Sequence, residues 1–501
     1  MLPSTAYARN LCEHYVVTHF ACYNTSARAH YCHIRVNRVG ETIKATSEPI
    51  PACLSEAERI LVPNKLFSFG YFSHMETNIL MSIIRATLLA FLVVLFSSSA
   101  LHAESASDGT TFDVASATQA YLDRLDPEQR AASDAYFEGG YWLDLWELLY
   151  GLLIAWILLN FRISTRMRDL GEKVSRFKFL RVTSYIVQYT LIVFVVSFPW
   201  VIYRNFVREH DYGFSNLDFP DWFGEQLIGL GVSLVMSTLG IALIYLVIRK
   251  APKTWVIWGS FAGIAMLSFV FMVSPVFINP LFNDYQSLSE GPLKENILSL
   301  ARANTVPADD VFTFDASKQS TRISANVSGL FGTTRISLND NLLNRTSPDS
   351  IQAVMGHEMG HYALNHGPKM LISFGIVMVI GFAFVRWAFD RVNKSSWGIR
   401  DVGDIAGLPL MIALFSVYLF LVSPLTNSII RINEAEADIF GLNASRKPDG
   451  FSEAILGLSE YRKMKPGYWE EIIFFDHPSG YNRIYLSMQW KKENLESSVE
   501  D

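Results

Sequence analysis

Six apolar stretches, each long enough to cross a lipid bilayer, dominate this sequence of 501 residues. A helix needs roughly 20 apolar residues to span the ~30 Å hydrocarbon layer. Half of the chain is hydrophobic and only 18% is charged, so we predict a mostly α-helical, polytopic membrane protein. The predicted spans run from about Tyr141 to Phe161, Ser184 to Tyr203, Leu227 to Ile248, Trp255 to Ile278, Met370 to Phe389 and Ile405 to Ile430.

Lysine and arginine are distributed unevenly between the loops that join these stretches. The loop after the first span holds seven of them, whereas the next loop, up to Glu225, holds only Arg204 and Arg208. Because basic residues gather in cytoplasmic loops, we predict that the first loop is cytoplasmic and that residues 279–369 and the carboxyl-terminal tail lie on the outer side. The seven basic residues are Arg162, Arg166, Arg168, Lys173, Arg176, Lys178 and Arg181.

The formal net charge of −6 is spread along the chain without a basic block. A protein that binds nucleic acid usually concentrates positive charge against the phosphate backbone. We therefore expect a lipid bilayer and a protein or peptide substrate as partners, and no nucleic acid. The sequence leaves the oligomeric state open.

Residues 75–103 have the layout of a secretory signal peptide, in which Arg85 precedes an apolar run and then small residues. Since signal peptides begin chains, we interpret residues 1–74 as a leader foreign to the native protein, which would start at Met75 or Met81. The alternative is a genuine small metal-binding or disulfide domain in front of an internal membrane helix, because this segment holds all four cysteines of the chain. The cysteines are Cys12, Cys22, Cys32 and Cys53.

Chemistry is concentrated in one short motif, H-E-x-x-H, which begins at His357. Ser347 or Asp349 can cap the start of a helix ahead of it, so His357 and His361 lie one turn apart on one face, where two imidazoles can bind one Zn²⁺. Glu358 lies beside the first ligand and can take a proton from a zinc-bound water that attacks a peptide carbonyl. The motif predicts a zinc metalloendopeptidase with one Zn²⁺ per chain.

A catalytic zinc site takes three protein ligands, and Glu434 is the best candidate for the third. The last apolar span continues into its helix. Asp438 lies one turn further on the same face and can accept the free N–H of a ligating histidine; we also place Arg431 behind the ligands. The alternative for Glu434 is a surface salt bridge with Arg431. Glu436 points to the other side of the helix, where we expect a solvated carboxylate.

The other histidines after the signal region have different expected roles. His477 could supply a second imidazole that stabilises the oxyanion of a tetrahedral intermediate. His366 lies five residues beyond His361 and off the ligand face, so we expect a structural or helix-terminal role. His210, in a charged loop, is most simply solvated.

Residues 321–343 read as a β-hairpin, with a turn at Gly329 to Thr334. Metallopeptidases often hold an extended substrate against a strand edge, where backbone groups pair with any sequence. Ala325 and Asn326 are our candidate substrate-binding residues on that edge. A plain structural hairpin is the alternative.

The zinc helix and the segment 431–438 are accompanied by shorter motifs in one order along the chain. These are Phe198-Pro199-Trp200, Asp211 to Phe214, Asn279 to Asn283, Glu290 to Lys294, Asp315 to Lys318, Ser324 to Asn326, and His477-Pro478 with Arg483. Together they resemble the integral-membrane zinc metalloproteases of the CAAX prenyl endopeptidase type I family, from about Val195 to the carboxyl end.

The resemblance implies a thermolysin-like zincin site of His357, His361 and Glu434, with Glu358 as general base, that faces a large chamber enclosed by membrane helices. It further implies that Asn326 touches the substrate or its oxyanion and that His477 acts in the transition state. Members of the family cleave short carboxyl-terminal segments from prenylated proteins and cut some unprenylated membrane-associated chains.

Two departures from the family modify this expectation. The family typically has seven spans and this chain has six, with the missing one expected at residues 169–181. Losing one span inverts everything after it, which agrees with a catalytic domain on the periplasmic side of a bacterial inner membrane. Since bacteria generally lack prenylated substrates, we expect cleavage of membrane or envelope proteins more broadly.

We divide the mature chain into a membrane domain of four spans, residues 104–278, and a zinc peptidase domain, residues 279–501, which contains the last two spans. A catalytically silent zinc scaffold and a transporter are the alternatives. Glu358 argues against the scaffold, because a structural zinc site needs no base. The scarcity of charged residues within the spans argues against the transporter.

Overall fold

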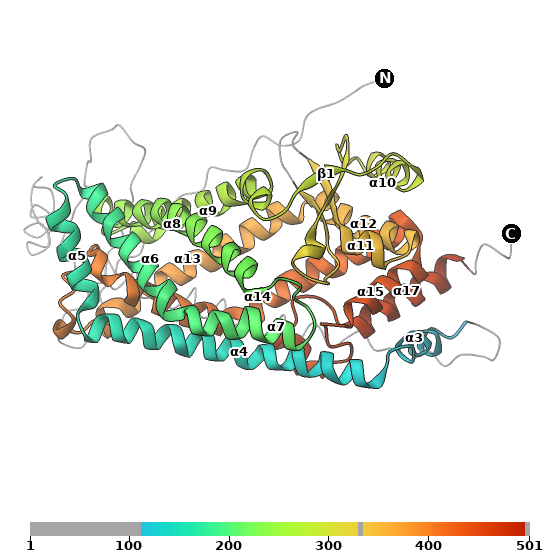
Figure 1. Ribbon diagram of the computed structural model, residues 1–501, viewed down its shortest axis with the longest axis horizontal. Helices are drawn as coiled ribbons and strands as arrows, with labels where there is room; N and C mark the ends of the chain where they lie inside the picture. The colour runs from blue at the N-terminus through green and yellow to red at the C-terminus, as the bar shows by residue number, and fades with distance from the viewer. Residues whose placement is uncertain (1–111, 329–333, 496–501) are drawn as a thin grey trace, which may run out of the picture. The chain divides into compact units, whose positions relative to one another are not determined.

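The computed structural model describes residues 112–328 and 334–495, which belong to one compact unit. The predicted leader at 1–74, the signal peptide at 75–103 and residues 329–333 of the predicted turn lie outside the described residues. Within the described part, long helices are accompanied by one small sheet (Figure 1). The predicted fold class, a mostly helical membrane protein with a small β element, is confirmed.

Six helices of the described chain are long and apolar enough to cross a membrane, as predicted from the sequence. Side chains on their outer faces are apolar and exposed, for example Val195 at 67%, Phe271 at 66% and Leu421 at 68%. So much exposed apolar surface fits lipid rather than water. The helices are α4 (Pro127–Asn160), α6 (Lys178–Ile202), α8 (Phe219–Lys250), α9 (Trp255–Val273), α13 (His366–Val392) and α14 (Leu408–Ser445).

Two of these helices extend well beyond the apolar stretches that revealed them. α4 begins at Pro127 rather than near Tyr141, and α14 continues past Ile430 to Ser445, as expected from the helix predicted around Glu434. Polar residues fill both extensions, so hydropathy alone marks only the part suited to lipid. The extension of α14 is the part that carries Glu434 and Asp438.

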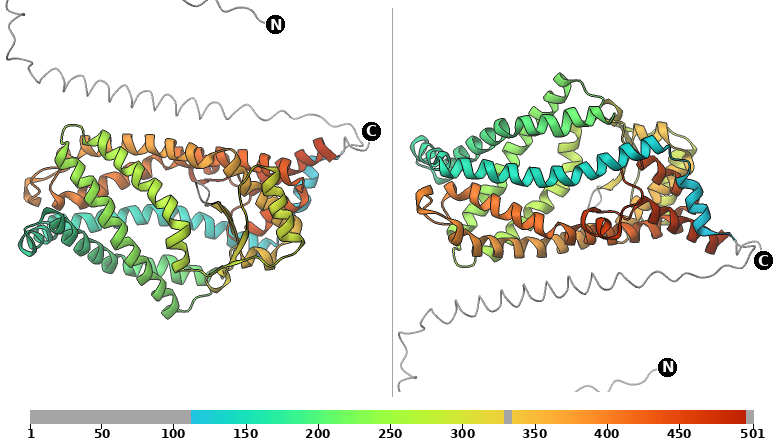
Figure 2. Two further views of the ribbon diagram at one scale, coloured as in Figure 1. Left: turned by 90° about the horizontal axis from the view of Figure 1, so that it is seen from above. Right: turned by 90° about the horizontal axis from the view of Figure 1, so that it is seen from below.

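Shorter helices connect and cover the long ones, and several gather with the strands at one end of the described unit (Figures 1 and 2). α12 packs against both α14 and α15. The shorter helices are α3 (Val114–Leu122), α5 (Ile163–Val174), α7 (Arg208–Asp211), α10 (Pro292–Ala303), α11 (Asp340–Arg345), α12 (Pro348–Ala363), α15 (Pro448–Leu458), α16 (Tyr468–Phe474) and α17 (Gly480–Leu495).

The sheet has four strands in the order β1-β2-β4-β3. The predicted hairpin consists of β3 (Ala325–Ser328) and β4 (Arg335–Asn339), which pair antiparallel, and β3 is an edge strand. β2 (Val311–Phe314) pairs parallel to β4, and β1 (Tyr285–Ser287) pairs antiparallel to β2. Strands of three and four residues are too short to show periodicity, which is why β1 and β2 were not predicted.

The sheet packs on α10 and α12 through a fully buried apolar core. Ile297 of α10, Ile336 and Leu338 of β4, and Met355 of α12 are all 0% exposed. Burial of such side chains contributes about 1.5–3 kcal/mol each. The core therefore fixes β4, and with it the edge strand β3, relative to the helix that carries the H-E-x-x-H motif.

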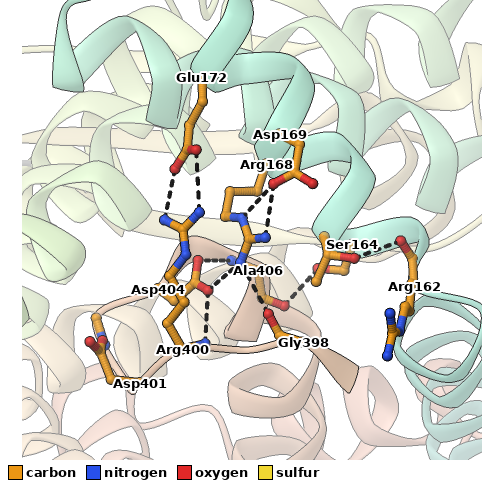
Figure 3. A network of polar contacts seen from close by, with 12 residues as sticks. Arg162, Ser164, Arg168, Asp169, Glu172, Gly398, Arg400, Asp401, Asp404 and Ala406 are labelled. Carbon is orange, nitrogen blue, oxygen red and sulfur yellow. Dashed lines mark hydrogen bonds and ion pairs between the residues drawn. The ribbon is translucent and has the colours of Figure 1, made fainter. Parts of the chain in front are cut away.

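Charged pairs join α5 to the loop between α13 and α14 at the end of the described unit away from the sheet (Figures 1 and 3). Arg168 lies 2.6 Å from Asp404, whose side chain is 3% exposed, and Arg400 lies 2.9 Å from Glu172. The buried pair satisfies both charges, and the exposed pair adds a second attachment. α5 is thereby a clamp on the loop, and its twelve residues are too few to span a membrane.

Candidate metal centre

α12 begins as the sequence suggests and crosses α14 at very short range. Ser347 caps it by accepting the Ser350 N–H at 3.2 Å, with Pro348 in the first turn. A Cβ atom on Gly360 would lie 3.2 Å from the Cα atom of Ala437. Small residues at this crossing let the two backbones approach, so the histidine face of α12 lies against Glu434 of α14.

Three predicted ligands, His357, His361 and Glu434, converge at this crossing. The Nε2 atoms of the two histidines are 3.1 Å apart. Glu434 Oε2 lies 3.2 Å from His357 Nε2, and Glu434 Oε1 lies 3.4 Å from His361 Nε2. All of these donor atoms lie within 4.8 Å of one another, so one ion can be reached by all three side chains.

The chemistry of this donor set fits a zinc ion. Two imidazoles and one carboxylate are a ligand set of catalytic zinc sites. Glu434 is 7% exposed, and its buried Oε2 atom faces the Nε2 atoms of His357 and His477, each at 3.2 Å. A buried carboxylate is costly unless a cation balances its charge. The carboxylate therefore suits a metal ion, whereas the alternative salt bridge with Arg431 is not formed among the described ion pairs.

His357 is held from behind by a buried acid and a buried arginine. Its Nδ1 atom lies 2.8 Å from Asp438 Oδ1. Arg483 of α17 donates to both oxygens of Asp438, at 2.8 and 2.6 Å. The carboxylate accepts the Nδ1–H of His357 and leaves the Nε2 lone pair for a metal. From the sequence, Arg483 was identified only as part of a motif. Its contact with Asp438 was not predicted, because no sequence spacing indicates a contact between residues 45 positions apart.

His361 has a support of its own, which the sequence analysis did not predict. His366 Nδ1 lies 2.9 Å from His361 Nδ1, and His366 Nε2 lies 3.1 Å from Glu436. Lys369 donates to the same Glu436 oxygen at 2.8 Å. Glu436, expected to be a free solvated carboxylate, is thus half-exposed but paired.

The break between α12 and α13 at Asn365 explains why helical spacing missed this contact. Asn365 has a φ of 57°, in the left-handed region that asparagine tolerates better than most residues. This turn ends the path of α12 and begins α13 at His366, which is 1% exposed. The ring of His366 therefore contacts His361, a position that a continuous α12 helix would not give it.

Protonation in this cluster is set by burial and by the neighbouring carboxylates. Burial lowers the pKa of His361 to about 4, so its ring is neutral at pH 7. Burial also lowers the pKa of His357, but hydrogen bonds to Asp438 and Glu434 outweigh it and raise that pKa to about 9. Because a ligating imidazole must be neutral, a metal ion here competes with a proton on His357.

Glu358 and His477 line a cavity of about 310 Å³ beside the three convergent groups. Burial raises the pKa of Glu358 to about 7, close to the value at which a carboxyl group both accepts and donates protons near neutrality. His477 Nε2 lies 3.2 Å from Glu434 Oε2, and its Nδ1 lies 2.7 Å from Asp476. The predicted base and the predicted oxyanion residue thus line the same cavity as His357, one of the three candidate ligands.

Arg431 does not lie behind the ligands, where the sequence analysis placed it. Its guanidinium donates to the carbonyl oxygens of Glu471 and Phe475 and, at 3.0 Å, to Ser428 Oγ. Phe475 is two residues before His477. Arg431 therefore anchors the segment that presents His477, because a long side chain on α14 reaches outward to the neighbouring loop more readily than inward to the crossing.

The two candidate substrate-binding residues of β3 lie on different cavities. Ala325 lines the cavity that contains Glu358 and His477. Asn326 lines a second cavity of about 490 Å³ with residues of α8 and β1. Successive side chains of a strand point to opposite faces, so β3 separates the two cavities and borders both.

Two family models match almost the whole described chain. Residues 287–487 match the model of peptidase family M48, and residues 114–284 match that of the CAAX prenyl protease N-terminal region, described as five membrane helices. In the second range the described chain has four helices that could span a membrane. The structural comparison agrees on the fold, because the crystal structure of S. mikatae Ste24p superposes with a TM-score of 0.64 at 22% identity, covering 75% of this chain and 95% of the other.

Named relatives with similar sequences support the same family. An uncharacterized metalloprotease, YhfN of Bacillus subtilis (strain 168), is 30% identical over 349 residues, which are 68% of this chain and 79% of the relative. A CAAX prenyl protease 1 homolog of Dictyostelium discoideum is 30% identical over 339 residues, which are 66% and 77% of the two chains. With these matches and the His-His-Glu cluster in place, the chain belongs to peptidase family M48, as a membrane-embedded metalloprotease of the CAAX prenyl protease type.

Proposed function

We propose that this protein is a zinc-dependent endopeptidase that cleaves membrane-associated or envelope proteins. The observation that carries the proposal is the convergence of His357, His361 and Glu434, of which His357 lines a cavity together with Glu358. In this proposal the three residues hold one zinc ion. When bound, zinc supplies a Lewis acid that polarises the scissile carbonyl and makes a neighbouring water more acidic.

The remaining steps fall to side chains of the chain itself. Glu358 removes a proton from the attacking water and delivers it to the leaving amine, a double role that suits a carboxyl group with a pKa of about 7. His477 donates a hydrogen bond to the oxyanion that forms at the carbonyl, held in place by its contact with Asp476. Asp438 and His366 keep the two histidine rings oriented.

We propose that the substrate binds as an added strand along β3. β3 is the edge of the sheet, so its outer backbone groups are available for pairing. Ala325 borders the cavity of Glu358, and Asn326 borders the second cavity, so neighbouring substrate side chains would enter different cavities. Backbone pairing of this kind tolerates many sequences.

The proposed location is a bacterial inner membrane with the metal centre on the periplasmic side. Basic residues in the loop around α5 and one fewer span than the five of the matched membrane-helix model support this orientation. Relatives are named as CAAX prenyl proteases, but with an outward-facing site we propose membrane and envelope proteins as substrates rather than prenylated chains alone. A periplasm-active reporter fused after Asp501 should be active, and activity only from a cytoplasm-active reporter would refute the orientation.

The catalytic proposal is tested with the full chain purified in detergent. Metal analysis should find about one zinc per chain in the wild type and in Glu358→Gln, whereas only the wild type should cleave unstructured peptides. Glu295→Gln, on the exposed side of α10, is the matched control and should keep full activity. Equal cleavage by wild type and Glu358→Gln would sink the mechanism. Zinc-loaded wild type that cleaves nothing would favour a silent scaffold.

A further inference from the structure

The cavity beside the metal centre contains a guanidinium group without a partner. Arg462 follows α15 and lines the same cavity as His357, Glu358 and His477. Within residues 112–328 and 334–495, no hydrogen bond or ion pair joins its side chain to another residue. The cavity's other arginine differs, because Arg483 is paired with Asp438 through two hydrogen bonds.

Nearby carboxylates are already engaged and leave Arg462 uncompensated. Asp476 and Glu434 both act on it electrostatically. Asp476 is bonded to His477 Nδ1 at 2.7 Å, and Glu434 faces the two histidines of the metal centre. Neither comes within ion-pair distance of Arg462 among the described contacts.

A charged arginine without a partner in this cavity lowers the stability of the folded protein. Burial disfavours its charged form and lowers the pKa of Arg462, and the nearby Arg483 adds repulsion. Arginine nevertheless remains protonated in proteins, so the cost is not relieved by loss of the proton. A planar guanidinium of this kind binds carboxylates in a bidentate manner.

The lining of the cavity also includes the apolar side chains of Phe451, Ile455 and Leu458. This combination of one cationic fork and apolar side chains matches a carboxylate carried by an otherwise apolar segment. We infer that Arg462 binds a carboxylate of the substrate, close to the scissile bond, and thereby makes this enzyme prefer peptides with a negative charge at that place. The inference rests on the proposed peptidase function and assigns a specificity residue to it.

Two sources can supply the carboxylate, a free carboxyl terminus or the side chain of an acidic residue. Three peptides of the same apolar sequence separate them: one with a free terminus a few residues after the cleavage site, one with an amidated terminus, and one amidated with a glutamate near the cleavage site. The wild type should cleave the first or the third with a kcat/KM about tenfold or more above that of the neutral amidated peptide. A preference for either acidic peptide supports the inference and identifies the source.

The variants Arg462→Gln and Arg462→Lys then assign the preference to this residue. In Arg462→Gln the ratio of acidic to neutral kcat/KM should fall about 10- to 100-fold towards one, through the acidic peptide alone, and Arg462→Lys should restore part of it. Arg302→Gln, an exposed arginine of α10, is the matched control and should keep the wild-type ratio. Zinc content should be unchanged in all three variants, and none of them should unfold at a lower temperature than the wild type.

Several outcomes would overturn the inference without touching the peptidase function. One is a wild type that cleaves all three peptides equally, a result that stands even where Arg462→Gln does not fold. Another is an Arg462→Gln that loses the same factor on charged and neutral peptides, as expected of a merely structural residue. Failure of the peptidase function looks different, because then no peptide is cleaved in a Glu358-dependent manner.

Discussion

Gly441 of α14 lies directly against His357 of α12. A Cβ atom on Gly441 would stand 2.7 Å from the His357 backbone nitrogen and 2.9 Å from its Cα atom. Real side chains do not approach backbone so closely, and both atoms belong to helices that cannot yield locally. The absence of a side chain at position 441 therefore sets the distance between the helix of the H-E-x-x-H motif and the helix of Glu434.

We predict that Gly441→Ala separates the two helices and disrupts the metal centre. Zinc content and peptide cleavage should both fall, together with a loss of stability of about 1–3 kcal/mol from overpacking. The control is Gly231→Ala in α8, where an added Cβ meets nothing within 4 Å. Metal analysis and thermal unfolding of the two variants check this, and a zinc-replete Gly441→Ala would contradict it.

The ion pair of Asp438 and Arg483 should contribute both to the stability of the fold and to zinc affinity, although neither residue is a candidate ligand. Arg483→Gln leaves a carboxylate that is 0% exposed without its cation. We expect a loss of stability of about 3–5 kcal/mol and a zinc affinity lowered by about 10- to 100-fold. Competition with a metal chelator measures the affinity. An unchanged affinity would show that Asp438 orients His357 unaided.

His366 should support zinc binding through His361. Removing its ring in His366→Ala frees the His361 Nδ1 atom and should lower zinc affinity by about 10- to 100-fold. Glu436→Gln, which alters only the half-exposed outer contact, should have a smaller effect. His210→Ala is the histidine control, because that exposed ring contacts the Phe206 and Leu217 carbonyls and the Phe206 ring rather than the metal centre. The same chelator titration applies, and equal affinities in His366→Ala and His210→Ala would refute the role.

The clamp of α5 should weaken in acid. A hydrogen bond from Arg400 lowers the pKa of Glu172 below its ordinary value of 4.5 in the folded chain. A carboxyl group with a depressed folded pKa stabilises the fold above its unfolded pKa and loses that contribution as the pH falls through the folded value. Solvent screens this exposed pair, so the effect is at most about 1 kcal/mol.

Thermal unfolding of wild type and Glu172→Gln in detergent, between about pH 3 and pH 7, measures this contribution. The wild type should be the more stable protein at neutral pH, and the difference should shrink at the acid end. A difference that stays constant with pH would mean that the Glu172 charge contributes nothing to the clamp.

Periodic features of this molecule were predictable from the sequence, and contacts made across a break between two helices were not. Hydropathy located six spans, and the repeat of 3.6 residues per turn brought His357, His361, Glu434 and Asp438 to the right faces of their helices. The contact of His366 depends on one left-handed residue, Asn365, whose conformation no pattern announces. Arg431 shows the opposite error, because a position one turn from a ligand does not decide where a long, flexible side chain ends.

α14 carries both a membrane span and the third candidate ligand as one helix of 38 residues. A helix accommodates a thinner or thicker bilayer by tilting, and a tilt moves every residue along its length. Glu434 therefore shares the motion of the lipid-embedded part, and the tight contact of Gly441 with His357 transmits that motion to α12. Bilayer thickness should thus affect the geometry of the metal centre. The rate of cleavage in vesicles of different acyl-chain length measures how strongly thickness and activity are coupled.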